Sequence, residues 1–312
     1  MVTESQLTTD QQVQTIWNLG GLTPKQLAVR VWREIDHDNV LGRASELAYN
    51  FLLSVFPLLL FVLALLGVLA AHGLDVRNLL FQYLGRVLPG SASDLIAKTA
   101  NEVIENSGGG KLTFGIIFSL WTASGGTTTM MSTLNDAYDV RESRSWVKVH
   151  LIALLLTLAL VLLVVVGSGL AVAGGHIALS LGNDIGLGTA AIVAWRVISW
   201  IAAIAFIVFA FALIYYYGPD VKQQHWYWIT PGSVLGVLLW VIASAGFRVY
   251  LHFYNSYSRT YGSLGAVIIL MLWLYVTGLA FLVGGEVNAE IEHAAADRGH
   301  PEAKAEGEKK AA

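Results

Sequence analysis

Long runs of apolar residues with almost no charge limit the possible folds of this chain more than any other feature. Residues 47–71 and 151–173 are two such runs. About 20 apolar residues cross the hydrocarbon core of a bilayer as one α-helix. Only 13% of the 312 residues are charged, against about 25% in a typical soluble domain. The sequence therefore predicts a membrane protein with several spans, and excludes a soluble enzyme, a disordered chain and, since cysteine is absent, a disulfide scaffold.

We expect an all-α integral membrane protein with six transmembrane helices, because the runs are too long for barrel strands and do not alternate. The predicted spans are residues 47–71, 112–134, 149–173, 192–217, 229–250 and 263–285. The chain then divides into a cytoplasmic N-terminal segment at 1–46, a membrane domain at 47–291 and a disordered cytoplasmic tail at 292–312.

The distribution of Lys and Arg predicts the orientation of these spans. Segments on the side of the two termini carry about twice as many Lys and Arg as segments on the other side, and positive residues collect in the cytoplasm. We therefore expect a multi-pass protein of the bacterial inner membrane with both termini cytoplasmic.

Two parts outside the spans have helical patterns. Residues 23–36 predict an amphipathic surface helix, since Thr23 and Gln26 form a capping box and Leu27, Val31 and Ile35 share one face. Residues 72–111, between spans one and two, predict a helical extracytoplasmic hairpin that turns at Pro89-Gly90.

Polar residues within and beside the spans are the candidates for function, because lipid penalises unpaired polar groups. Many are spaced three or four residues apart and so share a helix face, and Pro57 predicts a kink. The candidate pathway, or polar face of the bundle, comprises Glu46, Tyr49, Asn50, Ser54 and Pro57; Trp121, Ser124, Thr128, Ser132 and Asn135; Ser244 and Arg248; and Glu286 and Asn288.

Two interpretations of these polar stripes remain open. Each single Ser or Thr is better explained as a helix–helix contact, and the Gly232/Gly236 pair also fits close packing. Three stripes that converge in one bundle make a polar central cavity about equally plausible.

Several segments, in order, resemble the YihY/BrkB family of bacterial inner-membrane proteins, formerly labelled ribonuclease BN-like. They are Leu47-Ala48-Tyr49 through Ser54-Val55-Phe56-Pro57, Trp121-Thr122-Ala123-Ser124, Leu134-Asn135-Asp136-Ala137-Tyr138, Pro219-Asp220, Thr230-Pro231-Gly232, Tyr261 through Ala266, Trp273-Leu274-Tyr275 and Gly285-Glu286-Val287-Asn288-Ala289-Glu290. The resemblance implies six helices with both termini cytoplasmic, and it implies no secure activity. Asn50 stands where the family pattern usually has an aromatic residue.

Three functions compete on the sequence alone. The leading hypothesis is transport or flipping of a small solute, amphiphile or lipid through a polar-lined bundle, with membrane lipids as partners. The alternative is a membrane scaffold for envelope machinery. A ribonuclease is the weakest alternative, because Asp36-His37-Asp38 is the nearest approach to a catalytic cluster and no basic patch is available to hold RNA. We expect no cofactor, metal or nucleic acid; the oligomeric state is not predicted.

Overall fold

The structure, a computed structural model, describes residues 15–70, 109–184, 188–221, 229–253, 263–300 and 303–308. Over these residues the chain is helical and contains no strand. The elements are η1 (Leu19–Gly21), α2 (Pro24–His37), α3 (Val40–Ala70), α6 (Gly109–Ala137), α7 (Trp146–Asp184), α8 (Gly188–Tyr217), α9 (Pro231–Phe253) and α11 (Ser263–Asp297). The predicted hairpin at 72–111 lies almost entirely outside the described residues.

Six of these helices are long, from 23 residues in α9 to 39 in α7. Four stretches of the described chain are long and apolar enough to cross a membrane: Trp146–Val164, Val193–Tyr217, Pro231–Leu251 and Val267–Asp297. These stretches correspond to predicted spans three to six.

Several helix ends differ from the predicted ends of the spans. Helix α3 begins at Val40 instead of 47, α7 continues to Asp184 instead of 173, and α11 continues to Asp297 instead of 285. Apolar character marks the lipid-facing part of a helix, and a helix can extend beyond it.

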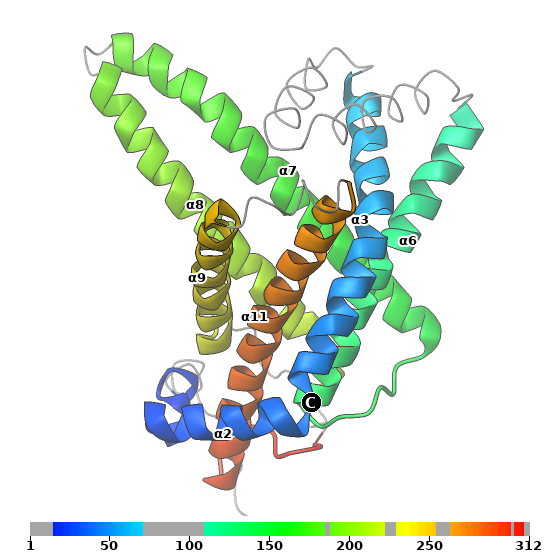
Figure 1. The fold of residues 1–312 in the computed structure, drawn as a ribbon, viewed down its shortest axis with the longest axis vertical. Helices are drawn as coiled ribbons and strands as arrows, with labels where there is room; N and C mark the ends of the chain where they lie inside the picture. Colours follow the sequence, from blue (N-terminus) through cyan, green and yellow to red (C-terminus); the bar gives the residue numbers. More distant parts are fainter. Residues whose placement is uncertain are drawn as a thin grey trace, which may run out of the picture.

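The bundle is built around α3 and α11, which lie beside each other in the middle of Figure 1, with α6 along α3 and α9 along α11. Buried Leu47, Leu134, Phe281 and Leu282 form the centre of the apolar core. Helices α7 and α8 pack on each other, and their far ends extend away from the other helices.

Helices α9 and α11 cross closely at glycines. A β-carbon on Gly284 would lie 2.6 Å from the carbonyl oxygen of Gly232, and one on Gly236 would lie 3.2 Å from the carbonyl oxygen of Ala280. Only the absence of side chains at this crossing lets the two backbones approach, in agreement with the packing interpretation of the Gly232/Gly236 pair.

Helix α2 lies across one end of the bundle and crosses the lower part of α11 (Figure 1). Its capping box is confirmed: the Gln26 backbone N–H donates to Thr23 Oγ1 at 3.3 Å, and the Thr23 N–H donates to Gln26 Oε1 at 2.9 Å. The predicted apolar stripe contacts α11, since Leu27 and Val31 are buried against Ile291 and its neighbours.

Part of the segment predicted as a disordered tail at 292–312 is described by the structure. Helix α11 continues to Asp297, with Ala294 and Ala295 buried. Beyond it, Lys304 Nζ lies 2.8 Å from Glu292 Oε2 and is only 3% exposed. Ala303 beside it is also buried.

Candidate functional site

The polar stripes predicted on α3 and α6 bond mainly within the helices. The Gly126 N–H donates to Ser54 Oγ at 3.0 Å and joins the two helices. Asn50 Nδ2 donates to the carbonyl oxygen of Glu46 on its own helix at 3.0 Å. Ser124 and Thr128 likewise donate to carbonyl oxygens of α6. These side chains are therefore satisfied by their own or the adjoining helix.

Asn135 belongs to a polar network that sequence analysis did not foresee. It donates from Nδ2 to Glu142 Oε2 at 3.0 Å and accepts the Asp220 N–H at 2.6 Å. Arg144 binds Glu142 through two nitrogens, at 2.8 and 2.6 Å, and donates to the Gly218 carbonyl at 2.8 Å. The network ties the α6–α7 loop to the end of α8. Its only sign in the sequence is the charged residues of that loop and Asp220, which follows Gly218-Pro219.

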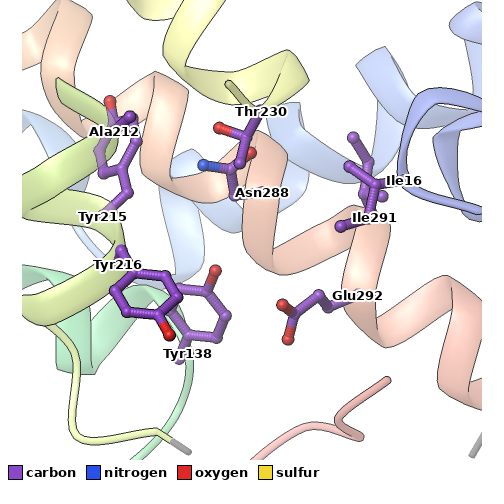
Figure 2. Close-up of a pocket in the computed structure, with 9 residues that line it drawn as sticks. All are labelled: Ile16, Tyr138, Ala212, Tyr215, Tyr216, Thr230, Asn288, Ile291 and Glu292. Carbon is purple, nitrogen blue, oxygen red and sulfur yellow. The ribbon is translucent and has the colours of Figure 1, made fainter. Parts of the chain in front are cut away.

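Asn288 fastens α11 to the start of α9, because its Oδ1 accepts the Gly232 N–H at 3.0 Å. It also lines a small pocket of about 20 Å³. Figure 2 shows Asn288 and Glu292 on α11 on one side of this pocket and Tyr138 and Tyr216 on the other. Such a volume holds about one water molecule, which is too small for a substrate.

The remaining predicted residues of α3, α6 and α9 do not meet at one point. Tyr49, Ser132 and Arg248 are exposed, and Pro57 is half-buried inside an α3 that continues through it. Trp121 is partly exposed and stacks on His150 of α7, with 5.2 Å between ring centroids. Ser244 has an enclosed hydroxyl oxygen without a hydrogen-bond partner.

A polar cavity of about 570 Å³ lies between the end of α2, the start of α3 and the end of α6. Glu46 is the one predicted site residue on its wall. The wall consists of His37, Asp38, Asn39, Gly42, Arg43, Glu46, Asp136, Asp139, Val140 and Arg141. Carboxylates outnumber arginines in this lining, so the cavity is acidic.

The ionisable groups of the cavity perturb one another. Burial, followed by the charge of Asp139, raises the pKa of Asp38 to about 6. The hydrogen bond to Asp38 raises the pKa of His37. Arg43 pairs with Asp136 at 2.8 Å and with Glu46 at 3.1 Å. Protonation at Asp38 and His37 is therefore sensitive to pH close to neutrality.

Glu34, His37 and Asp38 bring three possible metal-binding atoms within 4.8 Å of one another. His37 Nδ1 lies 3.1 Å from Asp38 Oδ1 and 3.4 Å from Glu34 Oε2. A protonated His37 between two carboxylates explains this arrangement without a metal, and His37 is largely exposed. We assign no metal to these residues.

Glu286 of α11 is only 2% exposed. Its Oε2 has no hydrogen-bond partner. The charges that act on it are those of Asp38, Glu34, Glu290 and Asp139, with Asp38 the strongest. The sequence left open whether Glu286 faces the bundle or the cytoplasm; the structure places it inside the protein.

Helix α2 also borders an apolar groove of about 350 Å³. Its wall is formed by Leu19, Pro24, Leu27, Ala28, Val31, Trp32, Ile35, Leu235, Val283 and Val287. Trp32 is 74% exposed there. Helix α2 therefore borders an apolar space along its length and an acidic polar space at its C-terminal end.

Comparison with known proteins identifies the relatives of this chain. The profile of the family described as Virulence factor BrkB matches residues 31–308. The "Putative ribonuclease-like protein YfkH" of Bacillus subtilis is 36% identical over 248 residues, covering 80% of this chain and 88% of the relative. A "UPF0761 membrane protein" of Vibrio atlanticus is 30% identical over 260 residues, covering 82% and 79% of the two chains. No solved structure matches the chain.

Proposed function

Because the chain belongs to the BrkB family of membrane proteins, and because one end of its helix bundle has both an acidic cavity and an apolar groove, we propose that it transports or flips an amphiphile across the bacterial inner membrane. In this proposal α3 and α6 also cross the bilayer and complete six spans. The alternative substrate is a small polar solute, which would require the cavity but not the groove.

The observation that carries the proposal is that two unlike spaces border α2, a polar one at its C-terminal end and an apolar one along its length. The cavity of about 570 Å³ presents charged groups, and the groove of about 350 Å³ presents aliphatic side chains and Trp32. An amphiphile needs both environments, a polar one for its headgroup and an apolar one for its chain.

The charge of the cavity supports a substrate with a cationic group. Asp38, Glu46, Asp136 and Asp139 outnumber Arg43 and Arg141 on its wall. An ammonium group is attracted to such a surface, whereas an anionic headgroup or an RNA backbone is repelled. This argument also disfavours nuclease activity for this chain, although the word ribonuclease appears in the name of one relative.

We place this end of the bundle in the cytoplasm. The support is the excess of Lys and Arg on the side of the two termini. The described N-terminal and C-terminal segments meet at this end, where the Arg298 guanidinium donates to the Gly20 carbonyl. Lys304 packs against Glu292, so this part of the tail is less suited to serve as a free arm of a scaffold.

The proposal is tested with purified full-length protein in liposomes. Two probes carry a fluorescent acyl chain, one on phosphatidylethanolamine and one on phosphatidylglycerol, and a membrane-impermeant quencher reports transfer between leaflets. We expect faster transfer of the ethanolamine lipid than in protein-free liposomes, and a smaller effect on the glycerol lipid.

Paired variants connect the transfer rate to the cavity. Glu46→Gln removes a carboxylate from the wall and should slow transfer of the ethanolamine lipid several-fold. Ser45→Ala alters the adjacent exposed residue, whose hydroxyl donates to the Leu41 carbonyl of its own helix, and should leave the rate unchanged. Equal rates with and without protein for both lipids would refute flipping.

A further inference from the structure

We propose that Glu286 is a proton-binding site that exchanges its proton with the acidic cavity through Asp38 and His37. The inference deepens the proposed function and rests on it in one respect: in a transporter, the proton held at Glu286 is the coupling ion. The binding site itself follows from burial, missing partners and surrounding charge.

The first argument is that Glu286 is enclosed without a hydrogen bond to Oε2. Its exposure is 2%, and no ion pair reaches it from the described part of the chain. An ionised carboxylate that is removed from water without a partner is strongly unfavourable, and binding a proton is the usual way in which such a group becomes neutral.

The second argument is that the charges facing Glu286 are negative. Helix α2 contributes Glu34 and Asp38, the α6–α7 loop contributes Asp139, and α11 contributes Glu290. The charge of Glu286 also acts on Tyr138, which is buried and un-ionised near neutral pH. Every acidic neighbour disfavours a further negative charge.

Two arginines near this end of the bundle, Arg30 of α2 and Arg43 of α3, are engaged with other carboxylates. Arg30 contacts Glu290 and Asp297, each at 3.6 Å. Arg43 contacts Glu46 and Asp136. Neither arginine forms an ion pair with Glu286, so neither cation neutralises this carboxylate in place of a proton.

The third argument distinguishes a proton from a metal ion. In the described residues, the only three side chains whose metal-binding atoms gather within 4.8 Å are Glu34, His37 and Asp38. Glu286 is not part of that group and cannot be one of several ligands held at bonding distance. Metal ions need several such ligands, whereas a proton needs one oxygen.

A route for the proton leads from Glu286 to the cavity. Asp38 is the charged group with the strongest effect on Glu286, and its side chain is 11% exposed. Asp38 Oδ1 lies 3.1 Å from Nδ1 of His37, which is largely exposed, and both residues line the cavity. With a pKa of about 6, Asp38 can accept and release protons near neutral pH.

Infrared spectroscopy of the full-length protein in liposomes tests the site directly. At neutral pH, exposed carboxyl groups are ionised, so the carbonyl-stretch band of a protonated carboxyl reports a buried acid. We expect this band in the wild type and its loss in Glu286→Gln. Glu292→Gln is the matched control on the same helix, because Glu292 is paired with Lys304, and it should keep the band.

A second variant keeps the test valid if Glu286→Gln does not fold. Asp38→Asn removes the group that is proposed to pass the proton on and leaves Glu286 in place, so the band of the protonated carboxyl should remain. The same variant should slow several-fold the shift of the band after transfer to heavy water. An absent band, or one that persists in Glu286→Gln, overturns the site; an unchanged exchange rate in Asp38→Asn overturns the route.

The test separates this inference from the proposed function. If the band is present and assigned to Glu286 but no lipid transfer occurs, the proton site stands and the transport proposal fails. If lipid transfer occurs without the band and without dependence on a pH gradient, transport stands and the proton site fails.

Discussion

The glycine crossing of α9 and α11 gives the sharpest prediction about stability. In Gly284→Ala, the added β-carbon would lie 2.6 Å from the Gly232 carbonyl oxygen and closer still to the Tyr215 hydroxyl. Carbon–oxygen contacts normally begin at about 3.3 Å. The two helices must therefore move apart, or the tyrosine must leave its place.

The magnitude follows from the contacts that this movement breaks. Overpacking of a tight interior costs about 1–3 kcal/mol. Tyr215 donates to the Phe281 carbonyl at 2.5 Å in a fully buried position, and loss of such a bond costs about 1–2 kcal/mol more. Alanine regains about 0.5–1 kcal/mol of helix propensity. We expect a net loss of about 1–4.5 kcal/mol, or roughly a five- to two-thousand-fold lower folding equilibrium constant.

The assay is equilibrium unfolding of the purified protein in mixed micelles of a mild detergent with increasing sodium dodecyl sulfate, followed by circular dichroism. Gly246→Ala on α9 is the control, because a β-carbon there would meet nothing within 4 Å, and its stability should be equal to that of the wild type or slightly higher. Equal stability of Gly284→Ala and Gly246→Ala would contradict the close crossing.

Three further predictions concern single side chains. Arg144→Ala leaves Glu142 without its two charge-assisted bonds and should destabilise the protein by about 2–4 kcal/mol in the same assay; a loss below about 0.5 kcal/mol would mean that the network is not formed. Tyr215→Phe removes the hydroxyl bonded to Phe281 and should cost about 1 kcal/mol, and a more stable variant would contradict that bond. Burial raises the pKa of Asp38 from 3.8 to about 6, so its contribution to stability is largest below about pH 4 and is lost as pH rises to about 6. Thermal unfolding should show this decline in the wild type and a weaker decline in Asp38→Asn. Identical dependence of the unfolding temperature on pH in the two proteins would refute the prediction.

Local signals in the sequence were sufficient to predict α2, which lies across the end of the bundle, and the apolar helices. The Thr23 capping box involves residues three apart, so its chemistry is complete within one turn. Hydropathy identified predicted spans three to six because about 20 apolar residues report the bilayer directly. It did not predict that α7 continues to Asp184, since helical hydrogen bonding does not stop where the lipid ends.

The candidate site depended on contacts between distant segments, and the sequence predicted less of it. Glu142 and Arg144 meet Asp220 and Gly218 only after α7 and α8 have folded back. Ser54 and Asn135, two residues of the predicted polar stripes, each bond a separate partner. The position of Glu286 was undecidable from its sequence neighbours, because a residue after two glycines at the end of a span can point either way.

The contact between α2 and α11 has a consequence for biosynthesis. The apolar face of α2, with Leu27 and Val31, is covered by Ile291 and its neighbours from the last helix. Helix α2 is synthesised long before the last helix, so its apolar face must first be covered by the membrane surface. The two ends of the polypeptide are thus joined in the final step of assembly, and a nascent chain arrested before residue 287 would leave its first helix unpaired.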